Sequence, residues 1–340
     1  MPKKSKTEFA IDIGKALDKI SGSIVRTPLL RSEEFSRAFG CNLYFKYEHL
    51  QITGSVKARG AFLKVPSKKT GVRQGYVTAS TGNHGFGMAL AAQRSGSDFK
   101  LFMPTTVDRQ KIQKAQFLGA DISLCGASWD EANQAALAFS KESGWEFVHT
   151  FDDETVVAGH ATAALECLQE HPKFDVALCS IGGGGLARGF LGSLKEDIPS
   201  IRCYGVETFG AESMFLSLKN GKITTLPKIA SKATSIGIKA PTVSTFEFAR
   251  KNLDGLAVVG DHAAAVSQIH ILDCDKQLVE LAASCCVAAL EANLIPDIKG
   301  KDVLVLLCGG NVLSSELGIE KEIAPQVPAY LPIGKSALHL

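Results

Sequence analysis

The stretch Val176-Ala-Leu-Cys-Ser-Ile-Gly-Gly-Gly-Gly-Leu-Ala-Arg-Gly-Phe-Leu-Gly-Ser-Leu194 runs from an apolar segment through four glycines into an amphipathic segment. Residues Val176–Ile181 predict a buried strand, and Leu186–Leu194 predict the helix that follows it. The glycines Gly182–Gly185 allow consecutive backbone N–H groups to point into one concavity beside the positive end of that helix. Because four consecutive glycines cost backbone entropy on folding, we interpret them as a phosphate-binding loop rather than a flexible turn.

The same alternation of strand and helix continues along the chain. Further strands are predicted at Leu43–Tyr47, Gly75–Ala79, Phe99–Met103, Ile122–Cys125, Glu146–Thr150, Arg202–Val206, Leu256–Val259 and Val303–Cys308. Helices with apolar residues at i, i+3, i+4 and i+7 are predicted at Gly87–Arg94, Arg109–Leu118, Asp130–Lys141, Val156–Gln169 and Lys276–Ala292. This order indicates an α/β fold of parallel sheets with helices on both faces.

We expect two doubly wound domains, because 340 residues exceed the roughly 100–200 residues of one domain. The smaller domain is expected at residues 51–155 and the larger one at residues 1–50 plus 156–340. A ligand site is expected between them, at the carboxyl ends of the strands.

The composition excludes several classes of protein. Hydrophobic residues make up 45% and charged residues 21%, which is ordinary globular usage. The net charge of +2 carries no basic excess for nucleic acid, and the cluster Lys3, Lys4 and Lys6 is typical of a solvated terminus. No apolar run approaches the roughly 18–20 residues of a membrane span, and no secretory signal is visible, so a cytoplasmic protein is expected. The nine cysteines form no CxxC pair, which disfavours disulfide and zinc frameworks.

A second strand-to-helix junction carries a lysine, in Gln51-Ile-Thr-Gly-Ser-Val-Lys57-Ala-Arg-Gly-Ala61. The Thr-Gly-Ser turn supplies a helix N-cap and places Lys57 in the first turn of the helix. The positive field at that end lowers the pKa of the lysine and favours the free amine that Schiff-base chemistry needs. A Ser-x-Lys alone is usually a solvated surface feature, so Lys57 becomes a candidate only together with the other motifs.

A third junction carries Thr78-Ala-Ser-Thr-Gly-Asn-His-Gly85. Ser, Thr and Asn at a helix start are ordinary capping residues. A loop rich in hydroxyl, amide and backbone N–H donors at a helix N-terminus is also a good cradle for a carboxylate.

Two further strand ends leave alternatives open. Cys308, at the end of Val303–Cys308, either packs in the core or faces the cleft. In Val206-Glu-Thr-Phe-Gly-Ala-Glu-Ser213 the carboxylates are either solvated or combine with backbone carbonyls to hold a hard cation.

The glycine segment has a rival interpretation. Gly182-x-Gly184-x-x-Ala187 fits a dinucleotide fingerprint, and Glu207 ends the next strand about 20 residues later. An NAD-dependent dehydrogenase is therefore an alternative from a different class, although it leaves the segments around Lys57 and Asn83 unexplained.

Taken together and in this order, these segments resemble the fold-type-II pyridoxal-5′-phosphate enzymes, with their tryptophan synthase β-like fold. Within them the sequence is similar to the serine/threonine dehydratases, from Thr27-Pro-Leu to Asn311. The segments Phe151-Asp-Asp-Glu-Thr-Val-Val-Ala-Gly-His160 and Val206–Ala211 look closest to the animal-type L-serine dehydratases, to which serine racemases are related.

The resemblance implies a role for each segment. Lys57 would form the Schiff base with the cofactor and act as general base on the substrate Cα proton. Asn83 would bond the 3′-oxygen of the pyridine ring, and Cys308 would face the ring nitrogen. The other implied cofactor-binding residues are Val56, Gly182, Gly183, Gly184, Gly185, Leu186 and Ser235. The substrate carboxylate would be bound by Ser80, Thr81, Gly82 and His84, and a monovalent or divalent cation such as K+ by Gly182, Glu207, Ala211, Ile236 and Ile238.

The implied reaction is β-elimination of L-serine or L-threonine to a 2-oxo acid and ammonia, catalysed by a homodimer. Three residues depart from the family pattern. Val56 stands where many dehydratases have Phe, and Ser213 replaces an acidic cation ligand of some relatives. Thr81 stands where animal-type dehydratases have Ala and serine racemases have a serine that acts as second base. A serine racemase, or a lyase of another β-hydroxy amino acid, is therefore the close alternative.

Overall fold

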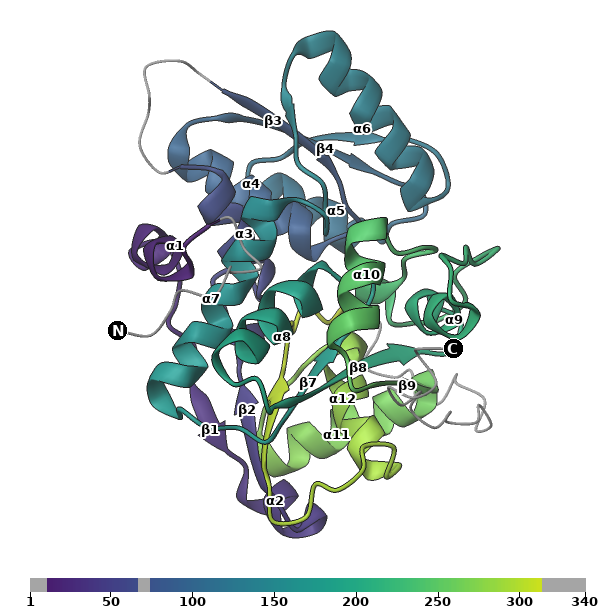
Figure 1. Cartoon of the computed structure of the whole chain (residues 1–340). Coiled ribbons are helices and arrows are strands. Elements are labelled where there is room, and N and C mark those ends of the chain that lie inside the picture. Colours follow the sequence, from purple (N-terminus) through teal and green to yellow (C-terminus); the bar gives the residue numbers. More distant parts are fainter. Residues whose placement is uncertain (1–10, 67–73, 314–340) are drawn as a thin grey trace.

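The structure, a computed structural model, describes residues 11–66 and 74–313, so Lys3, Lys4 and Lys6 lie outside the described residues. Within these ranges the chain forms two sheets, one above the other in Figure 1, and helices cover both. The strands β3–β6 fall within residues 51–155, and the strands of the other sheet fall before and after that range.

The larger sheet has the strand order β1-β2-β10-β7-β8-β9. Its strands are β1 (Leu29–Arg31), β2 (Asn42–Lys46), β7 (Val176–Ser180), β8 (Arg202–Thr208), β9 (Gly255–Val259) and β10 (Asp302–Leu306). All neighbouring strands pair in parallel except β1 and β2, which are antiparallel. The sequence did not predict β1, because three residues are too few to show a periodicity.

Helices cover both faces of the larger sheet (Figure 1). On one face α8 (Gly185–Asp197) packs on β7 and β8, with α7 (Glu154–Glu170) and α10 (Val243–Asn252) against it. On the other face α12 (Leu281–Glu291) packs on β7, β8, β9 and β10 and is backed by α11 (Asp261–Asp275). Every residue from Leu281 to Leu290 is buried, as expected of a helix that is apolar all round.

The prediction of one helix over Lys276–Ala292 is wrong for its first five residues. Lys276 adopts a left-handed φ of 58° and ends α11, and α12 begins only at Leu281. A left-handed residue at a helix end is usually glycine, so a lysine in that position gives no sequence signal for the break. The break matters because it leaves Glu280 at the N-cap of α12.

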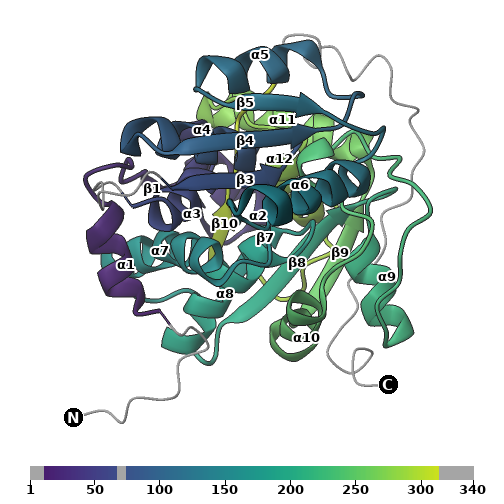
Figure 2. The same ribbon diagram turned by 90° about the horizontal axis from the view of Figure 1, so that it is seen from above.

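The smaller sheet has the order β5-β4-β3-β6 and is parallel throughout. Its strands are β3 (Gly75–Ala79), β4 (Asp98–Met103), β5 (Asp121–Leu124) and β6 (Glu146–Phe147), and Figure 2 shows β5, β4 and β3 side by side. The predicted strand Glu146–Thr150 forms a ladder only over its first two residues. The helices α4 (Asn83–Ser95), α5 (Arg109–Phe117) and α6 (Trp129–Ser143) pack on these strands.

The strand order reverses in both sheets, which predicts where a ligand binds. The chain passes from β3 to β5 at one edge and then places β6 on the other side of β3. It also passes from β7 to β9 and then places β10 on the other side of β7. Open α/β sheets bind ligands at the carboxyl ends of strands at such switch points, so a site is expected at the loops after β3, β6, β7 and β10.

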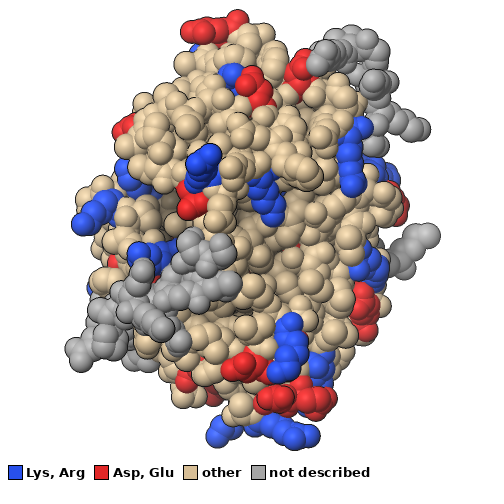
Figure 3. Space-filling view, turned by 180° about the vertical axis from the view of Figure 1, so that it is seen from behind, with Lys and Arg blue, Asp and Glu red and all other residues tan. Residues whose placement is uncertain are grey.

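The remaining elements are α1 (Ile13–Ile20), α2 (Glu33–Phe39), α3 (Lys57–Lys64), α9 (Ser213–Asn220) and the 3-10 turns η1 (Glu48–Leu50) and η2 (Thr234–Ile236). Helix α3 packs against both α4 and α7 and so joins the two halves of the molecule. Among the described residues, no helix is long and apolar enough to cross a membrane. The face in Figure 3 carries charged side chains of both signs without a broad patch of either.

Candidate active site

Two adjoining cavities lie at these switch points, between the two sheets. The first, here called the glycine-loop cavity, is lined by Ser55, Val56, Lys57, Asn83, Thr150, Phe151, Ser180, Gly182, Gly183, Gly184, Gly185, Leu186, Ala187, Ser235, Ile236, Ile238, Glu280 and Cys308. The second, here called the α4 cavity, is lined by Lys57, Ser80, Thr81, Gly82, Asn83, His84, Lys111, Trp129, Thr150, Thr234, Ser235, Gly237, Ile238, Glu280 and Asn311. Every residue predicted for cofactor or substrate lines at least one of them. Lys57, Asn83 and Glu280 line both, so the cavities are two ends of one cleft.

Lys57 is the first residue of α3 and lies where the two cavities meet. Its backbone N–H donates to Ser55 Oγ at 3.3 Å, as the predicted turn requires. Burial is the main cause that lowers the pKa of its ammonium group, and the nearby Cys308, Cys179 and Glu280 oppose that shift. Burial, rather than the helix field expected from the sequence, is therefore the main cause of the lowered pKa of Lys57. Its Nζ forms no hydrogen bond or ion pair within the described part of the chain, which leaves the amine available to a ligand.

A buried ion network holds α3 in place below Lys57. Arg59 is fully buried, and its guanidinium lies 2.6 Å from Glu166 of α7 and 2.8 Å from Glu48 of η1. Lys46 of β2 pairs with the same Glu166 at 2.7 Å. Two cations and two carboxylates therefore balance one another, and every member comes from a different element.

Side chains larger than glycine are excluded for steric reasons at three successive positions of the glycine run. A Cβ on Gly183 would lie 2.3 Å from the Phe151 ring, and one on Gly185 would lie 2.0 Å from the Phe151 carbonyl oxygen. Gly184 adopts a φ of +94°, which L side chains rarely occupy. The run opens α8, so its N–H groups lie at the positive end of a thirteen-residue helix. The loop is therefore built for a close approach of backbone to an anion.

The loop after β3 forms the wall of the α4 cavity. Ser80 is buried, and its Oγ accepts hydrogen bonds from the N–H groups of Gly82 and Gly85, both at 3.2 Å. Helix α4 begins at Asn83, four residues before the predicted start, so Asn83 and His84 lie in its first turn. Burial lowers the pKa of His84 to about 3, so this imidazole is neutral at physiological pH.

Three polar residues that were not assigned to the site connect to Asn83. Its Nδ2 donates to Glu280 Oε1 and Oε2 at 2.8 and 3.1 Å, and its Oδ1 accepts from Asn311 Nδ2 at 2.6 Å. Asn311 in turn accepts a hydrogen bond from Lys114 Nζ of α5. Glu280 and Asn311 are distant from Asn83 along the chain, so the sequence gives no sign that they contact it.

Cys308 follows β10 by two residues and lines the glycine-loop cavity. Of the two alternatives left open by the sequence, Cys308 therefore faces the cleft. Its Sγ is 3.5 Å from Ser180 Oγ. Burial raises the pKa of the thiol to about 12, so it is neutral and a weak hydrogen-bonding partner.

Of the predicted cation residues, Gly182, Ile236 and Ile238 line the glycine-loop cavity, whereas Glu207 and Ala211 do not. Glu207 is fully buried, and its carboxylate accepts N–H groups of Met214 and Phe215 at 3.0 and 2.7 Å. Burial raises the pKa of this carboxyl group well above its ordinary value. The Oγ of Ser213 is buried and finds no partner among the described residues. Gly182 and Ile236 touch through their backbones, since a Cβ on Gly182 would lie 2.8 Å from the Ile236 carbonyl oxygen.

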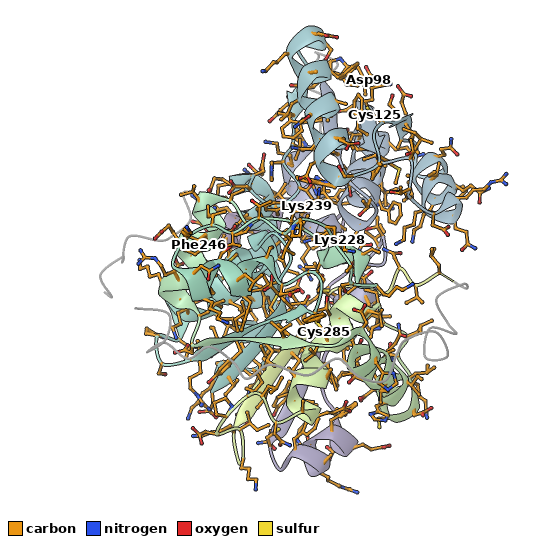
Figure 4. All side chains as sticks on the ribbon, turned by 90° about the vertical axis from the view of Figure 1, so that its right-hand side faces the viewer. Asp98, Cys125, Lys228, Lys239, Phe246 and Cys285 are labelled. Atoms are coloured by element: carbon orange, nitrogen blue, oxygen red, sulfur yellow. The ribbon has the colours of Figure 1, made fainter. Side chains whose placement is uncertain are left out.

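The α4 cavity opens outward between the two halves of the molecule. Two contacts cross this opening: Lys239 Nζ lies 3.0 Å from Asp130 of α6, and Lys111 Nζ lies 3.1 Å from Thr234 Oγ1. Figure 4 shows Lys239 and Lys228 at the level where the two halves meet. A further cavity, to which Asp130, Lys228 and Lys239 contribute, adjoins the α4 cavity. The residues that line both are Thr81, Trp129, Thr234 and Gly237.

A protein-family model described as pyridoxal-phosphate dependent enzyme matches residues 20–309. The chain belongs to this family. An L-threonine ammonia-lyase of Geobacter sulfurreducens is 39% identical over 88% of this chain and 75% of its own length. The processed threonine deaminase isoform 2 of Solanum lycopersicum has a TM-score of 0.82 at 28% identity, covering 95% of this chain and 94% of that one. Maize serine racemase has a TM-score of 0.84 at 28% identity, covering 91% and 95%.

The cleft fits the pyridoxal phosphate that this family uses. The glycine run leaves backbone room that any Cβ would fill. The Lys57 amine, which has no partner among residues 11–66 and 74–313, lies within the same cavity. The family match also decides between the two interpretations of that run, since it favours a phosphate loop of pyridoxal phosphate over a nicotinamide fingerprint.

Proposed function

We propose that this protein catalyses the β-elimination of L-threonine or L-serine to a 2-oxo acid and ammonia. The observation that carries the proposal is the position of Lys57, which lines both the glycine-loop cavity and the α4 cavity. A lysine there reaches a cofactor held on one side and an amino acid held on the other. L-threonine is the first expectation, because the Geobacter relative is named an L-threonine ammonia-lyase.

In this proposal the backbone N–H groups of Gly182–Gly185 and Leu186 bind the cofactor phosphate, and Lys57 Nζ holds the cofactor covalently. Val56 and Ser235 contact the ring from the cavity walls. Pyridoxal phosphate, when bound, withdraws electrons from the Cα of the amino acid. The neutral thiol of Cys308 would give the ring nitrogen only a weak hydrogen-bonding partner, which would limit how strongly the bound cofactor withdraws electrons.

The substrate is held by the loop after β3. Ser80, Thr81, Gly82 and His84 bind its carboxylate together with the N-terminus of α4. The Ser80 Oγ also holds the N–H groups of Gly82 and Gly85 in place. Because His84 is neutral, the loop binds the carboxylate through hydrogen-bond donors and the helix dipole rather than through an imidazolium. Lys57, released when the substrate amine takes its place on the cofactor, would remove the Cα proton, and the β-hydroxyl would leave with that proton as water. The resulting enamine would then react with water to give the 2-oxo acid and ammonia.

The test is 2-oxo acid release from a panel of L- and D-amino acids, with pyridoxal phosphate and K+ supplied. We expect 2-oxobutanoate from L-threonine or pyruvate from L-serine. If protein that carries its cofactor releases no 2-oxo acid from either substrate, the proposal is contradicted.

Racemisation is a second candidate function. The Thr81 side chain lines the α4 cavity together with Lys57, and a serine racemase is among the similar structures. A hydroxyl in that position is what a second proton-transfer group on Cα requires.

We also propose a cation site formed by the carbonyl groups of Gly182, Ala211, Ile236 and Ile238 with the carboxylate of Glu207. A buried carboxyl group and the buried Ser213 hydroxyl, which finds no partner in the described part of the chain, support it, because oxygen donors of this kind suit K+ or a hard divalent ion. K+ is expected to raise the melting temperature of the wild type and of Glu212→Gln, but not of Glu207→Gln. An equal rise in all three would contradict the assignment.

We further propose that the protein is a homodimer, in which residues 51–155 form the smaller domain of each chain and residues 1–50 plus 156–340 form the larger one. Light scattering should give twice the chain mass. A monomeric mass would contradict the first part.

A further inference from the structure

A chain of four hydrogen-bonded side chains runs from α5 through the cleft to the start of α12. Lys114 Nζ of α5 donates to Asn311 Oδ1. Asn311 Nδ2 donates to Asn83 Oδ1 at 2.6 Å and to the Thr53 carbonyl at 3.0 Å. Asn83 Nδ2 donates to Glu280 at 2.8 Å. The chain connects elements of both sheets.

The two ends of this chain fix its direction. An ammonium group has only donors, and a carboxylate has only acceptors. The ammonium of Lys114 therefore requires the oxygen of the Asn311 amide, which turns the Asn311 nitrogen toward Asn83. The Asn83 oxygen then accepts that bond, and its nitrogen is left to face Glu280 and the cleft.

Lys114 is held in position for this task by more than its hydrogen bond. Its ammonium lies 5.1 Å from the centroid of the buried Phe86 ring of α4, a distance at which a cation is attracted to an aromatic face. Burial lowers the pKa of Lys114, and Glu280 opposes the shift. The side chain thus faces the interior between α4 and the residues after β10.

We infer that Lys114 is a positioning residue that orients the Asn83 amide through Asn311, so that Asn83 presents N–H rather than oxygen to the cofactor. The inference rests on the proposed role of Asn83 toward the ring oxygen. Without the lysine, only the Thr53 carbonyl orients the Asn311 amide and only Glu280 orients the Asn83 amide, so a half-turn of both amides becomes more frequent. Asn83 would then place its oxygen against an oxygen of the cofactor and repel it.

The test is a double-mutant cycle on the affinity and visible absorbance of pyridoxal phosphate, measured without substrate. Lys114→Met keeps the length of the side chain but removes its donors, and we expect about tenfold weaker cofactor binding with a shifted absorbance maximum. Lys114→Arg keeps the donors and should bind the cofactor as the wild type does. In an Asn83→Ala background, Lys114→Met should cause no further loss.

Equal losses from Lys114→Met in both backgrounds, or no loss in the wild type, would overturn the inference. Lys141→Met, an exposed lysine of α6, is the matched control for loss of a surface charge. If Lys114→Met does not fold, Asn311→Asp gives the same test. It removes the N–H donor to Asn83 and should weaken cofactor binding by the same factor. None of these readouts uses elimination activity, so failure of the inference and failure of the proposed function are distinguishable.

Discussion

The Arg59 guanidinium lies 2.6 Å from the Glu166 carboxylate, and neither side chain is accessible to solvent. This pair joins α3, which carries Lys57, to α7 of the other half of the molecule. The position of the candidate catalytic lysine is thus set by a residue two positions along the chain, and the charges of this network line neither cavity.

Arg59→Met should therefore destabilise the protein strongly, because it leaves Glu48 and Glu166 buried without their main partner. We expect a loss of about 3–5 kcal/mol in the free energy of unfolding, measured by urea denaturation. Arg26→Met removes an exposed ion pair with Glu170 and should cost less than about 1 kcal/mol. Similar losses for the two variants would refute the assigned role of the buried network.

Gly185→Ala should impair cofactor binding, because the added Cβ would lie 2.0 Å from the Phe151 carbonyl oxygen. The backbone of the loop must shift, and its N–H groups then no longer converge on one phosphate. We expect at least tenfold weaker binding of pyridoxal phosphate in equilibrium dialysis. Gly22→Ala, which meets no atom within 4 Å, is the control, and wild-type affinity in both variants would count against the phosphate loop.

The glycine loop and its flanking strand and helix could be predicted from the sequence because they are consecutive in the chain. The same is true of the loop after β3 and of Lys57. The network of Asn83 could not be predicted, since Glu280 and Asn311 reach it only through tertiary packing. Glu280 was expected inside a helix that begins at Lys276, and not at a helix start. The left-handed residue that ends α11 is a lysine, and a lysine gives no sequence signal for such a turn.

Stability should fall as the pH is lowered from 6.5, because His84 has a pKa of about 3 in the folded protein and 6.5 when exposed. In this window the unfolded chain binds a proton that the folded chain does not, so the folded state loses about 1.4 kcal/mol per pH unit. In urea denaturation between pH 4 and 6.5, His84→Asn should reduce the pH dependence of the free energy of unfolding by the amount that corresponds to one proton. An unchanged slope would mean that His84 is protonated in the folded state.

Thr81→Ala should separate the two candidate activities. Elimination needs only Lys57 at Cα, so 2-oxo acid release should stay within about threefold of the wild type. Any formation of the D-amino acid, measured by chiral chromatography, should be lost in Thr81→Ala because the hydroxyl is absent. If elimination is lost and racemisation is kept, the role assigned to Thr81 is wrong.

The central claim is that Lys57 binds the cofactor, and borohydride reduction followed by peptide mass spectrometry tests it most directly. Borohydride fixes pyridoxal phosphate to the lysine that holds it, and the modified peptide then identifies that residue. We predict the cofactor mass on Lys57 and no modification, visible absorbance or turnover in Lys57→Ala. The cofactor on Lys111 or Lys114 instead, or unaltered turnover in Lys57→Ala, would contradict the account.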